Sequence, residues 1–531
     1  MSKRFEFFIA LLCLLSSKLN GEIESKNLPN ILICVSNNHA VRLLGDLNEL
    51  GSSLDPTPNL TKMLVSGGMH PLAYCTNAGT NSPLVPLLCG KTKLEELNGL
   101  NSSNTLAHFF KLAGYETAFF GSCSWLQNPS HLGFDYWKLL KDSEISINPM
   151  IKGLNNNYVI EGHATDIITD LVIDWLHSRE NTKPFIAIVS YQSTIRPWIP
   201  PLRLINQYND EWFETPSTFF SDMSTRAPPS KYQRMNIGTD LDPKYDLFLS
   251  NDLDINKTIS ALSIWEKNWL SMNQEQKTAW SLAWKSQNEA FSRETSQSES
   301  TSIWKYQRFL KNYLRCLFAM DQNIGRIIET ISSDLPVSCN FFYTSQKGNF
   351  TGEFGWFGND WMYDPSSRIP FIFGTVGSSN AYIPKLPKLL KDYEIHHVLK
   401  KIPSFSIPSV PGNQRKNSYH KSNFNNRLYF SHTDYPGKYR VSPHHGVREG
   451  RYKIIHYYPF DEWEFFDLEK DPMEVNNLLF QEPLSKIIEE YKKKLEESAA
   501  LSFNEQNQMK FTEKWKREQR SPKNKMRYLV Y

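Results

Sequence analysis

Cationic and amide side chains follow several apolar runs of this 531-residue chain. Asn37 and Asn38 end the first run, Arg196 comes shortly after a later one, and Gln346 and Lys347 follow the last. Arginine and lysine can bind an anionic glycan by charge, and neighbouring tryptophans can stack on it. Amide oxygens can ligate Ca²⁺, but without carboxylates the affinity should be poor. Arg196 and Lys347 are therefore candidates for anion binding, although a paired surface side chain is the simpler interpretation of each.

The cysteines show no catalytic or metal-binding spacing. There are seven, of which Cys13 lies in an apolar N-terminal stretch. The others are scattered, with no C-x-x-C pair and no zinc-finger spacing. An oxidising compartment would permit disulfides, but their pairing cannot be read from sequence.

The N-terminus predicts a secretory signal peptide over residues 1–21. Lys3 and Arg4 precede the apolar stretch 7–15, and cleavage after Gly21 fits the small and polar residues there. A buried N-terminal helix is the alternative. We therefore expect a secreted protein, extracellular or periplasmic, with no transmembrane segment in the mature chain. Glycosylation acceptors of the N-x-S/T type occur at Asn59, Asn101, Asn256 and Asn349.

The composition is that of a globular chain. Hydrophobic residues make up 40% and charged residues 22%, which argues against disordered and fibrous classes. The net charge is only +3, from 59 basic and 56 acidic residues. No charge excess predicts nucleic acid as a partner.

The elements that must position the candidate residues alternate between buried strands and helices. Continuous apolar runs are typical of strands buried on both faces, and stretches with helical periodicity lie between them. The pattern predicts an α/β fold with a mostly parallel sheet flanked by helices, and functional residues at the carboxyl ends of the strands. The predicted strands are 30–35, 117–121, 184–191 and 341–344, and the clearest helices are 105–113, 164–176 and 306–331.

Changes in composition divide the chain into parts. Residues 27–377 form the main domain, in which 208–302 lacks strand patterns and is predicted to be a helical insertion or cap. A basic stretch rich in Pro, Ser, Asn and Lys at 378–426 is typical of a linker or loose loop, and it contains His396 and His397. Residues 427–500 predict a small α+β subdomain, and 501–531 form a basic tail.

Several segments, in order along the chain, resemble the secreted sulfatases of the alkaline-phosphatase superfamily. They include PNILICVSNN, LAHFFKLAGYETAFFG, GEFGWFGNDWMYDPSSRIPFIF and GVREGRYKIIHYY. The resemblance implies a sulfatase-like fold with a small C-terminal subdomain. It also implies hydrolysis of sulfuric esters by a formylglycine nucleophile beside a calcium ion.

The nucleophile and metal positions depart from the family pattern. The family motif C-x-P-S-R falls on residues 80–84, so Thr80 stands at the nucleophile and Leu84 at the arginine. Thr80 could itself attack, as threonine does in related superfamily members, but that chemistry needs two metals with Asp and His ligands. The positions equivalent to the metal ligands are Asn37, Asn38, Gln346 and Lys347.

The positions that bind sulfate in the family are also changed. By the same resemblance, its lysines and histidines are replaced at Ser122, Ser124, Ile195 and Asn359. Neutral residues at these positions would remove the electrostatic stabilisation of a sulfate-ester transition state. His444 and Arg448 fall where the family carries substrate-side residues. They join Arg196 as candidate ligand contacts, with packing at a sheet edge as the alternative.

These departures lead to three hypotheses for function. The first is a non-catalytic sulfatase homologue that binds a sulfated glycan or a protein partner. The second is an active sulfuric-ester hydrolase with an atypical site, and the third is a structural or assembly scaffold. No cofactor is expected, and calcium is expected only if the mapping of the site is wrong.

Overall fold

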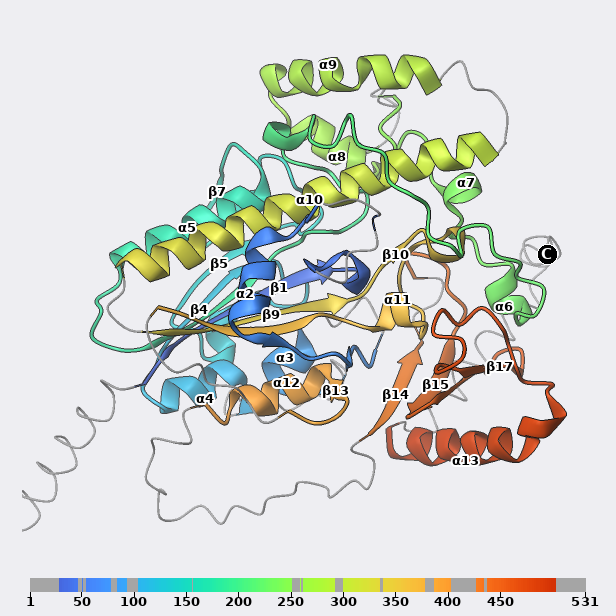
Figure 1. Ribbon diagram of the computed structural model, residues 1–531. Coiled ribbons are helices and arrows are strands. Elements are labelled where there is room, and N and C mark those ends of the chain that lie inside the picture. Colours follow the sequence, from blue (N-terminus) through green and yellow to red (C-terminus); the bar gives the residue numbers. More distant parts are fainter. Residues whose placement is uncertain are drawn as a thin grey trace, which may run out of the picture.

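The central element is a nine-stranded mixed sheet (Figure 1). The computed structural model describes residues 28–45, 50, 54–77, 84–92, 104–154, 156–250, 258, 261–291, 299–334, 338–377, 386–402, 426–433 and 437–502. The strand order is β2-β12-β9-β1-β8-β4-β5-β6-β7, and the five neighbours from β9 to β5 run parallel. Their bounds are β1 (Asn30–Asn38), β2 (Gly68–Met69), β4 (Glu116–Gly121), β5 (Tyr136–Leu140), β6 (Met150–Lys152), β7 (Asn157–Val159), β8 (Phe185–Ser190), β9 (Cys339–Lys347) and β12 (Phe371–Val376).

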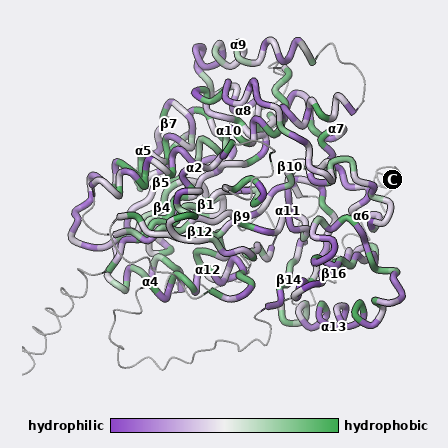
Figure 2. Tube along the Cα trace, in the orientation of Figure 1, coloured by the Kyte–Doolittle hydropathy of each residue, from purple (hydrophilic) through white to green (hydrophobic). Residues whose placement is uncertain are grey.

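The strand β1 lies in the interior of the sheet. β1 pairs with β8 on one side and β9 on the other, and nearly all its residues are buried. Figure 2 shows these central strands as the hydrophobic part of the chain, with hydrophilic residues concentrated on the outer elements. A strand with helices on both faces has no face left for water, so its apolar residues do not alternate with polar ones. The predicted α/β fold with a mostly parallel sheet is confirmed.

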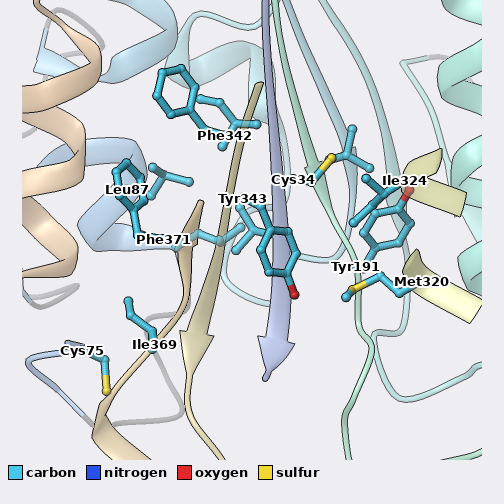
Figure 3. Packing of buried hydrophobic residues seen from close by; sticks show 14 of the residues in the cluster. Cys34, Cys75, Leu87, Tyr191, Met320, Ile324, Phe342, Tyr343, Ile369 and Phe371 are labelled. Carbon is cyan, nitrogen blue, oxygen red and sulfur yellow. The ribbon is translucent and has the colours of Figure 1, made fainter. Parts of the chain in front are cut away.

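Helices cover both faces of the sheet (Figure 1). In the close-up, Leu87 lies on one side of the central strands, and Met320 and Ile324 lie on the other (Figure 3). One layer contains α2 (Pro58–Ser66), α5 (Ala164–Ser178) and α10 (Glu299–Asp334), and the other contains α3 (Val85–Cys89), α4 (Leu106–Leu112) and α12 (Asp392–Leu399).

A buried carboxylate fixes the start of α2 against α10. Asp321 of α10 accepts hydrogen bonds from the backbone N–H groups of Asn59 at 2.9 Å and Leu60 at 2.8 Å. These are among the N–H groups that a helix start leaves without intrahelical partners. Burial raises the pKa of Asp321 to about 6, against the lowering effect of these hydrogen bonds. The side-chain amide of Asn59 also donates to Asp321, at 2.9 Å.

The described part of residues 208–302 is helical where it is regular. It contains α6 (Pro228–Lys231), α7 (Ile237–Asp240), α8 (Ile264–Ser271), α9 (Gln274–Phe291) and the first residues of α10. Trp265, Trp280 and Trp284 form a separate apolar cluster that reaches Ile199 of the main domain. The guanidinium of Arg308 in α10 lies over the Trp284 ring at 3.4 Å. This aromatic cluster explains why the segment is rich in tryptophan.

The prediction of a loose linker over 378–426 is wrong for residues 386–402. They form β13 (Leu390–Lys391), which pairs with β3 (Ala73–Tyr74), and the helix α12. His396 is buried, and its Nδ1 lies 3.0 Å from the carbonyl oxygen of Leu87. Apolar residues at helical spacing bury one face of α12, and surrounding basic and polar residues hid that pattern in the average composition.

The C-terminal subdomain is an antiparallel four-stranded sheet with one helix packed on it (Figure 1). The helix buries Ile488, Tyr491 and Leu495 against the sheet. The elements are β14 (Arg427–His432), β15 (His444–Glu449), β16 (Tyr452–Tyr457), β17 (Glu462–Asp467) and α13 (Ser485–Ser502). Two short strands, β10 (Phe350–Thr351) and β11 (Phe357–Gly358), and a four-residue helix, α11 (Asp364–Ser367), precede β12 in the chain.

The six cysteines in the described residues are free and buried. No disulfide therefore joins them in this structure. Within the described ranges, no helix is long and apolar enough to cross a membrane.

Candidate binding site at the carboxyl edge of the sheet

A cavity of about 260 Å³ opens at the carboxyl ends of the central strands. Many of its lining residues are positions that the sequence analysis predicted, and they come from segments far apart in the chain. Parallel strands bring their carboxyl ends to one edge, which is why these segments meet. The cavity is lined by Asn37, Asn38, Leu84, Ser122, Ser124, Ile195, Gln346, Lys347 and Asn359, all predicted site positions. Thr80 lies outside the described residues.

Hydrogen bonds hold the ends of β1 and β9 side by side. Asn38 pairs in register with Lys347. The carbonyl oxygen of Asn38 accepts from the hydroxyls of Tyr313, at 2.6 Å, and Thr194. The carbonyl oxygen of Lys347 accepts from the His39 N–H at 3.1 Å and from the Ser345 hydroxyl at 2.7 Å. The backbone that carries these side chains is therefore fixed.

An ion pair stands inside the cavity. The Lys347 ammonium lies 2.5 Å from a carboxylate oxygen of Asp360, and the side chains are 14% and 2% exposed. Asp360 has a φ of +81°, which few residues other than glycine adopt. Its neighbour Asn359 also lines the cavity. The pair places an ammonium that a carboxylate neutralises in the same lining as Asn37 and Asn38.

The residues present do not fit a divalent cation. Three carboxylates line the cavity, and Asp360 is already bound to Lys347. Asp392 accepts from the hydroxyl and the N–H of Thr76 at 2.8 and 3.2 Å, and burial raises its pKa to about 6. The third is Glu144, and no group of three or more His, Cys, Asp or Glu side chains within the described residues is arranged to hold a metal. Calcium requires several oxygen ligands with net negative charge, and an ammonium beside the amides opposes it.

The remaining predicted positions present short neutral side chains. Leu84 stands at the start of α3 in a left-handed conformation, with φ of +65°. Ser122 follows β4, and its backbone is bonded to β8: its N–H donates to the carbonyl oxygen of Ser190, and its carbonyl accepts from the Ser190 hydroxyl. These loops are held in place without presenting a charge.

Arg196 is engaged behind the cavity rather than exposed in it. Its guanidinium binds both carboxylate oxygens of Asp246 at 2.6 Å, and the Asp246 side chain is fully buried. It also lies over the rings of Phe357, at 4.9 Å, and Tyr245, at 5.1 Å. Burial and the Arg196 charge act in opposite directions on Asp246, and burial, the larger effect, raises its pKa. Arg196 is not among the residues that line the cavity.

His444 and Arg448 also lie away from the cavity lining and have partners within the fold. The His444 ring stacks on Trp361, and its Nε2 accepts from the Met362 N–H at 3.2 Å. Its pKa is lowered to about 3, chiefly by burial. Arg448 pairs with Asp364 at 2.9 Å and donates to the Tyr74 hydroxyl. The sequence left two interpretations open for His444 and Arg448, ligand contact and packing. In this structure both residues pack within the fold.

Sequence reasoning missed several polar residues of the cavity. Lys438 is one, and its ammonium donates to the carbonyl oxygen of Arg196 at 3.2 Å. Burial and the nearby Arg196 charge lower its pKa to about 8. No motif marks it, because it comes from the segment between β14 and β15. Asp360 could have been found, since it directly follows Asn359. The other missed polar residues are Asn77, Thr92, Ser143, Glu144, Thr344, Ser345, Asp392 and Tyr439.

The two glycosylation acceptors that the structure describes are packed. Asn349 is fully buried, and its amide donates to the carbonyl oxygen of Phe350 at 2.8 Å. The amide of Asn59 is bonded to Asp321. Neither side chain can carry a glycan in this conformation. Asn101 and Asn256 lie outside the described residues.

Known proteins share this fold. A solved protein in complex with its substrate D-glucosamine-2-N,6-O-disulfate superposes with a TM-score of 0.77 at 26% identity, covering 89% of this chain and 98% of that one. A phosphonate monoester hydrolase of Agrobacterium radiobacter has a TM-score of 0.53 at 14% identity, covering 90% of this chain and 96% of that one. The second likeness shows a shared fold alone.

Sequence comparisons give the family. An N-acetylglucosamine-6-O-sulfatase of Bacteroides thetaiotaomicron is 27% identical over 505 residues, which are 91% of this chain and 88% of that protein. An arylsulfatase of Clostridium perfringens is 22% identical over 519 residues, 88% of this chain and 92% of that protein. The family model "N-sulphoglucosamine sulphohydrolase, C-terminal" matches residues 352–500, and the model "Sulfatase" matches 29–381. The chain therefore belongs to the sulfatase family of sulfuric-ester hydrolases.

Proposed function

We propose that this protein is a non-catalytic member of the sulfatase family that binds a sulfated glycan in the cavity at the carboxyl edge of its sheet. The observation that carries the proposal is the character of the lining. Eight of the nine predicted positions are uncharged, and the ninth, Lys347, is paired with Asp360. A binding site has been kept while the groups suited to sulfate-ester cleavage are absent from these positions.

The lining positions that the resemblance assigns to catalysis lack the groups that cleavage needs. A sulfate-ester transition state requires an activated nucleophile and fixed positive charge aimed at the oxygens where negative charge develops. Leu84, Ser122 and Ser124 supply neither charge nor proton transfer near neutral pH. The amides of Asn37 and Asn38 do not make a site for a divalent cation that could polarise the ester.

The same lining suits a sugar. Amide and hydroxyl groups donate and accept hydrogen bonds, as sugar hydroxyls do. A volume of 260 Å³ equals that of about nine waters in the liquid, which is enough for a single sugar ring. Two of the relatives are named for, or solved with, sulfated glucosamine. A sulfated hexosamine is therefore the ligand class that we propose.

The first test counts bound metal and released sulfate. Purified protein in calcium-containing buffer is analysed for divalent ions per chain, and sulfate release is followed over a panel of aryl and glycan sulfates. We expect neither a stoichiometric metal nor turnover. Tightly held calcium together with sulfate release would establish an active hydrolase with an atypical site and overturn the proposal.

The second test measures binding. Titration calorimetry with D-glucosamine-2-N,6-O-disulfate should give a saturable isotherm, and unsulfated glucosamine should bind more weakly. As the cavity variant, Ser122→Trp places a bulky ring in the lining, and Ser178→Trp at the end of α5 serves as a control outside it. Binding lost only in the cavity variant supports the proposal. Absence of binding in the unmodified protein would favour a scaffold role.

We also infer that the protein acts outside the cytoplasm, in the extracellular space or a periplasm. The basic start and the apolar stretch at 7–15 support this location, because together they have the proportions of a signal peptide. Edman sequencing of protein secreted by its host should begin near Glu22.

A further inference from the structure

Two ammonium groups, Lys347 and Lys438, line the cavity from opposite parts of the chain. Lys347 is the last residue of β9 in the main domain, and Lys438 lies between β14 and β15 of the C-terminal subdomain. They differ in what holds them. Lys347 is neutralised by Asp360, whereas Lys438 donates to a carbonyl oxygen, that of Arg196. A carbonyl accepts a hydrogen bond without cancelling the charge of the donor, so Lys438 keeps more of its attraction for an anion.

The Lys347–Asp360 pair lies in the cavity lining, where the ends of β1 and β9 run side by side. Asn38 and Lys347 face each other across these strands, and both line the cavity. A covalently attached ammonium supplies positive charge permanently, without the carboxylate ligands that a calcium ion requires. It also repels any incoming cation. Because Asp360 neutralises Lys347, the positive charge that an anion meets comes chiefly from Lys438, and no metal is needed to supply it.

Resting on the proposed function, we propose that Lys438 anchors the anionic group of the ligand while Asp360 offsets the charge of Lys347, so that an anionic sugar binds without metal. The sulfate oxygens accept hydrogen bonds from Lys438. The carboxylate of Asp360 reduces the attraction between the Lys347 ammonium and the ligand. The hydroxyl and amide groups around them hold the sugar ring.

Variants of the two lysines and of Asp360 separate these roles. Titration calorimetry at pH 7, in buffer treated with EDTA, uses D-glucosamine-2-N,6-O-disulfate and, separately, inorganic sulfate as probes. Lys438→Met should lower the affinity for both probes at least tenfold, since a hydrogen bond to a charged group is lost. Lys438→Arg should recover most of the affinity, because arginine keeps the charge and the donors.

The two halves of the ion pair should give changes of opposite sign. Asp360→Asn removes the carboxylate that neutralises Lys347. It should increase the affinity for both probes three- to tenfold. Asparagine tolerates the positive φ of this position better than most residues. Lys347→Met leaves the negative charge of Asp360 without its ammonium partner. It should lower the affinity for both anionic probes at least tenfold. If the ion pair were merely structural, both variants would change the affinity in the same direction.

The control is Lys152→Met. Lys152 also donates to a carbonyl oxygen, that of Gln127 at 2.8 Å, but it does not line the cavity. It should leave both affinities unchanged.

The outcomes distinguish this inference from the proposed function. Inorganic sulfate alone could bind, with the affinity changes predicted for the variants, while the sugar does not. This result would keep the inference and remove the sulfated glycan as the ligand. Sugar binding that disappears with EDTA would keep the proposed function and overturn the inference. Unchanged affinity in Lys438→Met, or no binding of either probe by the unmodified protein, would also overturn the inference.

Discussion

Replacing Arg196 by methionine tests whether this arginine holds the fold or contacts ligand. Asp246 is fully buried and bound through both carboxylate oxygens, so Arg196→Met leaves a buried charge that keeps only the hydrogen bond from the Asp242 N–H, at 2.9 Å. Breaking a buried pair in this way costs about 3–5 kcal/mol. An independent limit comes from protonation. Holding an Asp protonated at pH 7 against an unfolded pKa of about 3.9 costs about 4 kcal/mol, and at pH 5 only about 1.5 kcal/mol.

The sign of the pH dependence follows from this limit. The carboxyl pKa is raised in the folded variant, so the folded state binds more protons than the unfolded state and loses stability as pH rises. We expect the loss in Arg196→Met to grow by about 1.4 kcal/mol per pH unit between pH 5 and 7. Urea unfolding followed by tryptophan fluorescence at both pH values measures it. In Arg196→Met/Asp246→Asn the charge is gone, and most of the loss should be recovered.

A matched exposed pair provides the control. Arg203 also binds its partner, Asp166, through two nitrogens, but the side chains are 42% and 25% exposed. Arg203→Met should cost about 1 kcal/mol or less, because exposed pairs are screened by water. Wild-type stability of Arg196→Met at pH 7, combined with lost binding of the sulfated sugar, would refute the structural reading and make Arg196 a ligand contact.

Three further predictions concern buried groups. The pKa of His444 is lowered to about 3, so the unfolded state binds the proton first and stability falls as pH drops below about 6.5; His444→Gln should flatten the urea midpoint between pH 6.5 and 4.5, and an unchanged slope would contradict this. Phe354 packs at 4.5 Å from the Arg226 guanidinium, so Phe354→His should cost about 2–4 kcal/mol in urea unfolding, and Phe354→Leu less. The six free cysteines should resist a thiol reagent in the folded protein and all react after denaturation, because burial raises their pKa values, that of Cys89 to about 11; fewer than six without reductant would reveal a disulfide.

The main sheet could be predicted because local sequence determines it. The runs at 30–35 and 341–344 are continuous and apolar, and only a strand covered on both faces buries every residue of such a run. The helix α12 was missed for the opposite reason. Its apolar positions are few, and they bury only because α3 lies opposite them.

The candidate site was only partly predictable. Parallel strands present their carboxyl ends at one edge, so Asn37 and Lys347 could be expected near each other from their place in the chain. Lys438 could not, since its position depends on how the C-terminal subdomain packs against the main domain. Arg196, His444 and Arg448 have the residue types of ligand contacts, but their exposure depends on neighbours that sequence does not reveal.

The sequence by itself determined the α/β fold and which residue types stand at the positions that the resemblance assigns to the catalytic groups of sulfatases. These are properties of local pattern and of position along the chain. Tertiary structure alone decided which charges meet. It placed Asp360 on Lys347, Asp246 on Arg196, and Lys438 at the cavity, because these contacts depend on how segments 13, 50 and 242 residues apart pack together.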